Sequence, residues 1–254
     1  MLILLPPSET KSSGGAGAPL DFGALTFPSL TPVRESIAAD LVALASGDTD
    51  RAREVLGLGP KLAAEVEADA SLMSSPTAPA LDRYTGVLFD ALDAASLPSA
   101  ARAHLAVGSA LFGVVGAEDP IPRYRLSGTV KLPEAGAAAD APAPTMRARW
   151  GRAITEALAD TGGFVVDLRS GAYMNLGKVP GAATCRVETP DGKVVSHFNK
   201  HHKGLLARAL SLAAADGVDI PDAAAAACVA RAAGLDARID GSGRAPLIVV
   251  TVRD

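Results

Sequence analysis

Basic and hydroxyl-bearing side chains, the groups that bind phosphate, gather in several short segments of this sequence. The densest segment is Asp119-Pro-Ile-Pro-Arg-Tyr-Arg125. Alternate residues of a strand share a face, so a strand here places Arg123 and Arg125 together on a phosphate, with Tyr124 pointing the other way. An edge strand with solvated arginines explains the same residues, and taken alone they favour it.

Lys11 stands between an apolar run, Leu2 to Leu5, and a small-residue tract, Ser12 to Gly17. A lysine in this position resembles those of phosphate loops. The pattern Gly-x4-Gly-Lys-Ser/Thr is absent, however, as are Gly-x-Gly-x-x-Gly and Gly-x-Ser-x-Gly. Phosphate binding of the ATPase type is therefore not supported.

Asp167-Leu-Arg-Ser-Gly-Ala-Tyr173 follows a predicted buried strand. Residues just beyond the carboxyl end of a strand often point into a binding crevice. We expect Arg169, Ser170 and Tyr173 to do so. An equally good reading is a polar turn with Ser170 as a helix N-cap.

Ser196-His-Phe-Asn-Lys-His-His-Lys203 is a third basic segment. Lys200 and Lys203 are three residues apart and share a face if a helix begins here. His201 and His202 are adjacent, and adjacent side chains diverge on regular elements, so a metal site is not expected. The segment predicts a basic patch, and we expect neither metal nor cofactor.

Leu56-Gly-Leu-Gly-Pro-Lys-Leu-Ala63 matches the helix-hairpin-helix pattern. Gly57 and Gly59 would let the backbone approach a DNA phosphate, with Lys61 beside them. Such contacts carry no base information. A structural corner between helices is an equal alternative, and the acids at 65, 67 and 69 count against phosphate.

The distribution of charge is uneven along the 254 residues, although the net charge is only −4. Residues 119–208 hold 13 basic and 8 acidic side chains, a local charge of +5, which leaves −9 for the rest. The pattern is compatible with an anion site on an acidic body, or with chance segregation of surface charge. Whole-chain charge argues against a general nucleic-acid binder.

Composition indicates a folded protein, with 48% hydrophobic residues. Cys185 and Cys228 are too few for a disulfide framework or a Cys-rich zinc site. The opening apolar run is too short for a signal peptide, and no segment reaches the length of a membrane span. We therefore expect a cytoplasmic protein that stays off the membrane.

Hydrophobic periodicity predicts strands interleaved with helices and at least one hairpin. Helical segments are expected at residues 36–70 (broken near 56–60), 146–158, 203–214 and 221–233, and residues 82–92 are expected to run from a loop into a helix. Strands are expected at residues 2–5, 124–132, 164–168, 247–252, within 101–115, and in a hairpin over 184–198. The prediction is a single α+β domain over 1–254, with a mixed sheet and a helical subregion at about 36–70.

Taken in order, these segments resemble the YaaA family of peroxide stress proteins. The resemblance runs nearly the whole length, through MLILLPPSETK, RYTGVLFDAL, GSALFGVVGAEDPIPRYRL, RWGRAITEAL, VVDLRSGAY and SHFNKHHKGLLARAL. Its more specific marks are Pro122 to Arg125 and Tyr84-Thr-Gly86. This chain opens Pro-Pro-Ser-Glu-Thr-Lys where many relatives read Ser-Pro-Ala-Lys.

The resemblance implies a compact α+β fold with a helix-hairpin-helix unit and a positively charged cleft. It further implies DNA binding and protection from peroxide through restraint of free iron. The residues that it assigns to the cleft are Lys11, Tyr84, Arg125, Ser170, Tyr173, Lys200 and Lys203.

Two functions follow from these expectations. One is a non-enzymatic DNA-binding stress protein; the other is an enzyme acting on a nucleotide, nucleoside or other small phosphorylated ligand in the same cleft. A third reading is an interaction module with an incidental cleft. The expected partner is therefore DNA or a nucleotide-like small molecule, and a monomer is favoured. No nucleophile, base and acid form a recognisable set, so no reaction is named.

Overall fold

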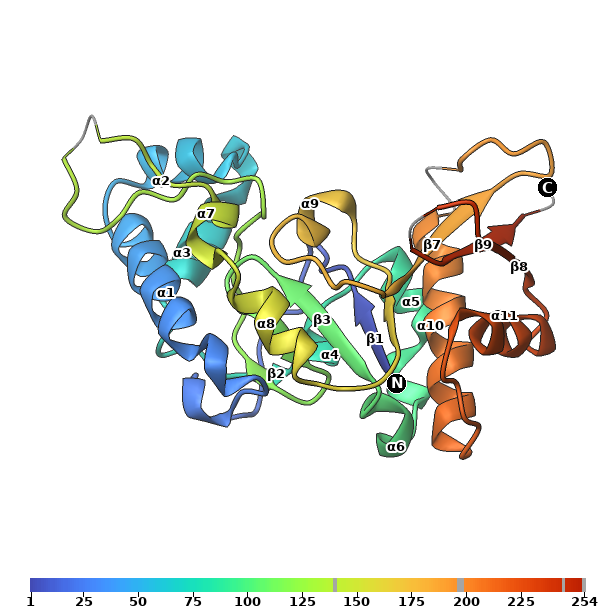
Figure 1. The fold of residues 1–254 in the computed structure, drawn as a ribbon. Coiled ribbons are helices and arrows are strands. Elements are labelled where there is room, and N and C mark those ends of the chain that lie inside the picture. The colour runs from blue at the N-terminus through green and yellow to red at the C-terminus, as the bar shows by residue number, and fades with distance from the viewer. Residues whose placement is uncertain (139–140, 196–198, 244, 253–254) are drawn as a thin grey trace.

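A seven-stranded sheet runs through the centre of the molecule (Figure 1). The computed structural model describes residues 1–138, 141–195, 199–243 and 245–252. The strands of the sheet, in spatial order, are β4 (Gly113–Gly116), β3 (Leu105–Ser109), β1 (Leu2–Leu5), β6 (Val165–Asp167), β7 (Ala183–Glu188), β9 (Leu247–Thr251) and β8 (Asp236–Asp240). A separate pair, β2 (Ala78–Pro79) and β5 (Pro120–Ile121), is antiparallel.

The inner strands of the large sheet are parallel. β1 lies between β3 and β6, with Ile3 opposite both Leu105 and Val166. Only the two edge strands, β4 and β8, run antiparallel to their neighbours. The α+β class with a mixed sheet is therefore confirmed. The continuous apolar sequence of β1 fits its place, because a central parallel strand is covered on both faces.

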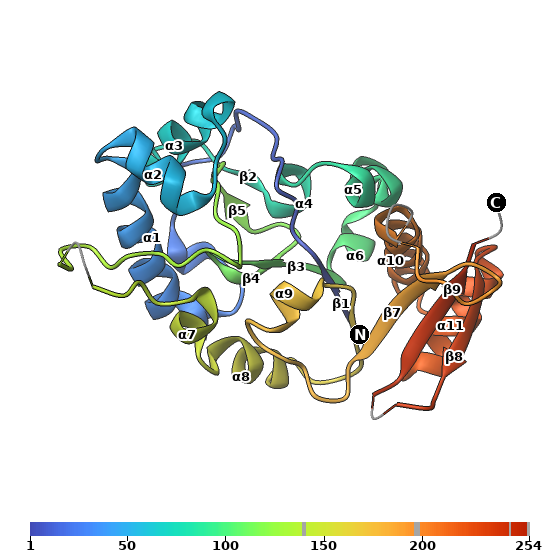
Figure 2. The same cartoon turned by 90° about the horizontal axis from the view of Figure 1, so that it is seen from above.

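Helices cover both faces of this sheet (Figure 2). One face carries α4 (Ala80–Arg83), α5 (Val87–Leu92), α6 (Ser99–Arg102), α10 (Asn199–Ala215) and α11 (Ala223–Ala232). The opposite face carries α8 (Ala153–Ala159) and α9 (Gly171–Met174). Beyond the β4 edge lie α1 (Thr31–Ala45), α2 (Thr49–Leu56), α3 (Ala63–Ala70) and α7 (Met146–Trp150). Short 3-10 turns are η1 (Phe22–Ala24), η2 (Pro28–Leu30), η3 (Pro60–Leu62) and η4 (Ala94–Ser96).

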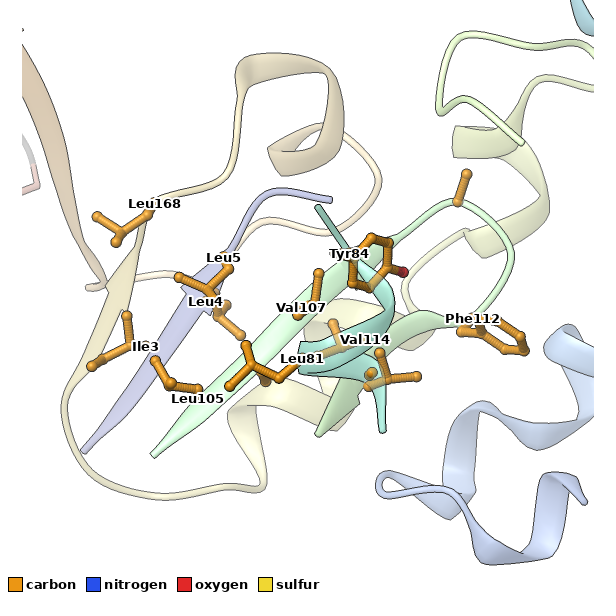
Figure 3. Packing of buried hydrophobic residues seen from close by; sticks show 14 of the residues in the cluster. Ile3, Leu4, Leu5, Leu81, Tyr84, Leu105, Val107, Phe112, Val114 and Leu168 are labelled. Atoms are coloured by element: carbon orange, nitrogen blue, oxygen red, sulfur yellow. The ribbon is translucent and has the colours of Figure 1, made fainter. Parts of the chain in front are cut away.

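The core forms where β1, β3 and β4 meet α4 (Figure 3). Leu81 and Tyr84 of the α4 region face Val107 and Val114 of the sheet. All four side chains are buried, and Phe112, in the β3–β4 turn, is fully so. This packing fixes α4, and with it Tyr84, against the carboxyl-terminal half of β3.

The sequence predicts most elements at the right place, with three errors. Residues 124–132 form no strand, because the Arg125 N–H donates to the Asp69 carboxylate at 2.7 Å rather than to a partner strand. The helix expected over 146–158 is two helices, since Gly151 adopts φ 51° and breaks it. The edge strand β8 was not predicted.

Two further predictions are met only in part. The helical region at 36–70 is interrupted at 46–48 as well as at 57–62. The hairpin over 184–198 is reduced to β7 and a bridge between Glu188 and Val194, and its residues 196–198 lie outside the described ranges. No helix in the described ranges is both long and apolar enough to cross a membrane.

Candidate functional site

The strand order indicates where a ligand-binding crevice is expected in this sheet. From β1 the chain crosses to β3 on one side and later returns to β6 on the other. Ligands of open parallel sheets bind beyond the carboxyl ends of the strands at this kind of reversal. Ser8 to Lys11 follow β1, Ser109 ends β3, and Arg169 and Ser170 follow β6. Segments far apart in sequence therefore converge there.

Lys11 lies at the centre of this region, against two tyrosine rings. Its Nζ is 4.2 Å from the Tyr124 ring centroid and 5.2 Å from that of Tyr84. Nζ donates a hydrogen bond to the Ser8 carbonyl at 3.1 Å. Burial, followed by the charge of Arg125, lowers the pKa of Lys11 to about 7, although nearby carboxylates oppose the shift. The amine is therefore partly neutral at physiological pH.

A chain of three hydroxyls lies beside the lysine. The Tyr84 and Tyr124 hydroxyls are 2.8 Å apart, and Ser109 Oγ is 2.7 Å from the Tyr124 hydroxyl. The Phe112 N–H donates to Ser109 Oγ at 2.9 Å. Burial raises the pKa of both tyrosines well above the ordinary value, so their hydroxyls keep their protons.

Asp69 brings a buried carboxyl group to the same place from α3. One oxygen, Oδ1, accepts the Arg125 N–H, whereas Oδ2 is buried without a hydrogen-bond partner. Burial raises the pKa of Asp69 to about 8, against the opposing effect of the Arg125 N–H and of Lys11. Both Lys11 and Asp69 thus change protonation near neutrality.

The three arginines predicted for a basic cleft are all paired. Arg123 Nη2 is 2.6 Å from Glu65 Oε1, and Arg125 Nη2 is 2.9 Å from Glu9 Oε2. Arg169 is fully buried, with its guanidinium on both oxygens of Asp167 at 2.7 and 2.8 Å and on the Gly177 carbonyl. Glu65, Glu9 and Asp167 offset the charges of these three arginines, and sequence analysis had not predicted these ion pairs. The three arginines therefore do not form an open basic cleft.

Arg123 and Arg125 do not share a strand face, because their segment is not a strand. Their partners, Glu65 and Glu9, come from α3 and from the loop after β1. Tyr124 was expected to point away from the phosphate site, but its hydroxyl lies within the site beside Ser109. Arg169 has a structural role, because its ion pair with Asp167 fixes the end of β6. Its side chain also packs closely on β3, where a Cβ on Gly108 would lie 2.7 Å from the Arg169 Cδ.

Tyr173 and Ser170 follow β6 but differ in exposure. The Tyr173 hydroxyl accepts the Gly128 N–H at 3.4 Å, and burial raises its pKa. The charges of Glu9 and Arg125 also act on Tyr173, so it lies close to the Lys11 region. Ser170 is exposed and precedes α9 as its N-cap residue, without a capping hydrogen bond from its side chain.

The two lysines at the start of α10, Lys200 and Lys203, differ in exposure and in their contacts. Lys203 Nζ donates to the Leu168 carbonyl at 3.1 Å, and burial lowers its pKa. Lys200 is exposed and lines a cavity of about 260 Å³. The other residues lining this cavity are those from Pro6 to Thr10 and from Thr85 to Phe89. The lining of this cavity includes Thr10, the residue that precedes Lys11 in the sequence.

The predicted DNA-contact turn lies between α2 and α3. Gly57 ends α2 with φ 66°, the usual helix-terminating conformation, and Gly59 has an ordinary φ of −68°. Lys61 is exposed in η3. A helix-hairpin-helix unit remains a prediction. The acids beyond the turn contact the arginine segment, since Glu65 binds Arg123 and Asp69 binds the Arg125 N–H.

Metal ligands do not gather in the part of the chain that the structure describes. His201 and His202 pack edge to face, with ring centroids 5.3 Å apart. The site residues that sequence reasoning missed are Glu9, Glu65, Asp69, Ser109 and Tyr124. One signal was available for two of them: Glu65 and Asp69 are four apart, and on a helix share a face.

Comparison with known proteins gives a consistent result. The family described as "Peroxide stress protein YaaA" matches residues 1–222. A UPF0246 protein of Corynebacterium glutamicum is 55% identical over 239 residues, covering 92% of this chain and 94% of that protein. One from Corynebacterium efficiens is 54% identical over 254 residues, covering 98% and 100%. One from Streptomyces coelicolor is 45% identical over 222 residues, covering 83% and 82%.

Proposed function

Because this chain belongs to the YaaA family of peroxide stress proteins, we propose that it acts in the response to peroxide and does so by binding a small, phosphate-bearing ligand of nucleotide type. The ligand occupies the part of the crevice beyond β1, in the cavity lined by residues 6–10, residues 85–89 and Lys200. The peroxide role rests on the family. The ligand class rests on the geometry of the crevice.

The observation that supports the ligand class is the cavity lined by residues 6–10, residues 85–89 and Lys200. Small-molecule pockets typically span roughly 300–1,000 Å³, and the cavity, at about 260 Å³, is slightly smaller than this range, which suits a small ligand. Hydroxyls of Thr10 and Thr85, 3.1 Å apart, and the exposed amine of Lys200 border it. Hydroxyl and ammonium donors of this kind bind phosphate oxygens.

Pairing of the arginines favours a small ligand over a duplex. DNA binding draws on several unpaired cations spread along a surface. Here Arg123, Arg125 and Arg169 already have carboxylate partners, which leaves Lys200 as the exposed amine on this cavity. One cation with adjacent hydroxyls suits a single phosphate group.

The test is calorimetric titration of the full chain with adenosine mono- and triphosphate, inorganic pyrophosphate and a 20-base-pair duplex. We expect a nucleotide to bind, and Lys200→Ala to weaken it at least tenfold. Lys131→Ala is the matched control, because Lys131 is also exposed but lies outside the cavity. Equal loss in both variants, or no binding of any phosphate compound, would contradict the proposal.

DNA binding through the α2–α3 turn is the second candidate, and one observation favours it. A Cβ added at Gly57 or Gly59 meets no atom within 4 Å, so the outer side of the turn is open to a partner. Since Gly59 has φ −68°, Gly59→Val adds bulk there without backbone strain.

Duplex affinity measured against salt concentration tests this candidate. If the turn binds the backbone, Gly59→Val weakens binding, and Lys61→Ala reduces the salt slope by about one. Lys131→Ala again serves as control. Unaltered duplex affinity in folded Gly59→Val would leave the turn with a purely structural role.

The peroxide role is tested in a host that lacks its own copy of the gene. The wild-type gene is expected to restore growth in hydrogen peroxide, and the Lys200→Ala gene to restore it less well than the Lys131→Ala gene. Equal restoration by both would separate the stress function from the cavity.

A further inference from the structure

The amine of Lys11 is held without a counter-ion. No carboxylate of the described residues forms an ion pair with it, and the Ser8 carbonyl and two aromatic rings are its contacts. Glu9, the nearest acid in sequence, pairs with Arg125 instead. An amine in such surroundings loses its proton more easily than a solvated one, and its pKa is lowered to about 7.

Asp69 is the second unusual group. Its Oδ2 is buried and lacks a partner, which is costly unless the oxygen carries a proton or meets a ligand. Its raised pKa indicates a carboxylic acid that keeps a proton at neutral pH. The side chain is 0% exposed, so this proton belongs to the interior of the site.

The hydroxyl chain supplies a further proton. Ser109, Tyr124 and Tyr84 carry three hydroxyl protons, but only two hydrogen bonds join them. One proton is therefore left over at one end, and which end holds it depends on the direction of the chain. Reorientation of the hydroxyls moves this proton between Ser109 and Tyr84.

We propose that Lys11 is a nucleophilic amine that forms an imine with a small aldehyde or ketone bearing a phosphate group. The inference rests on the proposed function, since the phosphate occupies the cavity beside Lys200. Lys11 does not itself line that cavity but directly follows the cavity residue Thr10, and the proposal places the carbonyl group of the ligand between the cavity and Lys11.

The chemistry balances without an oxidant or reductant. The Nζ lone pair attacks the carbonyl carbon, and the C=O π electrons move to oxygen, which takes up a proton. The resulting carbinolamine loses its C–O bond as the oxygen takes a second proton and leaves as water. The nitrogen gives up two protons in all, so the net change is one molecule of water released.

Asp69 and the hydroxyl chain fit the proton transfers of these steps. The protonated carboxyl of Asp69 can donate to the carbinolamine oxygen, and its carboxylate can then accept a proton from nitrogen. Tyr84, whose ring lies beside Nζ, connects to the left-over hydroxyl proton. The site thus holds a partly neutral amine and two proton donors.

Reductive labelling of the full chain tests the nucleophile. Formaldehyde with cyanoborohydride methylates neutral amines, and peptide mapping by mass spectrometry reports each of the seven lysines. At pH 7 we expect Lys11 to react on the order of tenfold faster than Lys61, which is exposed in η3. The rate at Lys11 is expected to level off just above pH 7. A Lys11 rate no higher than that of Lys61 overturns the proposal.

A second probe separates this inference from the proposed function. Glycolaldehyde phosphate and glycolaldehyde differ only in the phosphate. We expect the phosphate to accelerate labelling of Lys11 at least fivefold, and Lys200→Ala to remove that gain. Fast formaldehyde labelling without a phosphate gain would support the nucleophile but refute the phosphate cavity, and with it the ligand class proposed here.

Discussion

The Nζ atom of Lys11 lies 4.2 Å from the centroid of the Tyr124 ring, while the hydroxyl of the same tyrosine bonds to Ser109 and Tyr84. One aromatic side chain therefore contacts the amine with its face and orders the hydroxyl chain with its edge. Cation–π attraction to this ring favours the protonated amine and so opposes the effect of burial, which favours the neutral form. This relationship links the loop after β1 to the end of β3.

Lys11→Met is expected to change how stability depends on pH. Between pH 7 and 10.5 the unfolded chain keeps the Lys11 proton and the folded chain does not. Wild-type stability therefore rises with pH in this window, relative to the variant, by about 1.4 kcal/mol per pH unit. Urea unfolding at pH 7 to 10 measures the difference, and parallel curves for the two proteins would contradict the buried amine.

Asp69→Asn is expected to show the opposite sign at lower pH. Between pH 4 and 8 the folded chain keeps the Asp69 proton and the unfolded chain does not, so wild-type stability falls as pH rises. Relative to the variant, the fall is about 1.4 kcal/mol per pH unit. Urea midpoints from pH 4.5 to 7.5 provide the measurement. The double variant lacks both groups, so both contributions should be absent from its pH dependence.

Tyr124→Phe and Tyr84→Phe are expected to differ in cost. Removing the central hydroxyl leaves the buried Tyr84 hydroxyl without a partner and costs about 1–3 kcal/mol. Removing the Tyr84 hydroxyl leaves Tyr124 bonded to Ser109 and costs about 1 kcal/mol. Chemical denaturation compares them, and an equal or reversed order would show that the hydroxyls do not form a chain.

Arg169→Met is expected to destabilise the fold rather than alter ligand affinity alone. It leaves the buried carboxylate of Asp167 unpaired, which costs about 3–5 kcal/mol. Arg152→Met is the matched control, because its ion pair with Glu156 is exposed and contributes about 0–1 kcal/mol. A stable, folded Arg169→Met protein would return Arg169 to the list of ligand-binding candidates.

Local sequence patterns were sufficient for the elements that depend on short-range order. The apolar run at residues 2–5, the turn residues after it and the helical periodicity from about residue 36 predict β1 and the first helices, because burial and helix spacing are read from neighbours. The breaks at Gly151 and at 46–48 escaped prediction. A single glycine or a short polar turn interrupts a helix only when packing favours the bend.

The candidate site likewise contains some residues that local sequence patterns identify and some pairings that they do not. Residue types alone singled out Lys11 and Lys200, because a lysine after a buried strand and a basic helix start carry local signals, whereas Tyr84 was assigned only through the family resemblance. The pairing of Arg125 with Glu9, of Arg123 with Glu65 and the arrival of Asp69 from α3 carry none.

What the sequence determined by itself is the family, the α+β class and the set of polar residues near each strand end. What only the tertiary structure decided is the charge of the site. Partners separated by 58 and 116 residues meet only after β1, β3 and β6 align, so the neutralised arginines and the partly neutral Lys11 depend on distances that no local pattern contains. The pKa of a side chain is set by burial and by the charges around it, and both are properties of the folded chain.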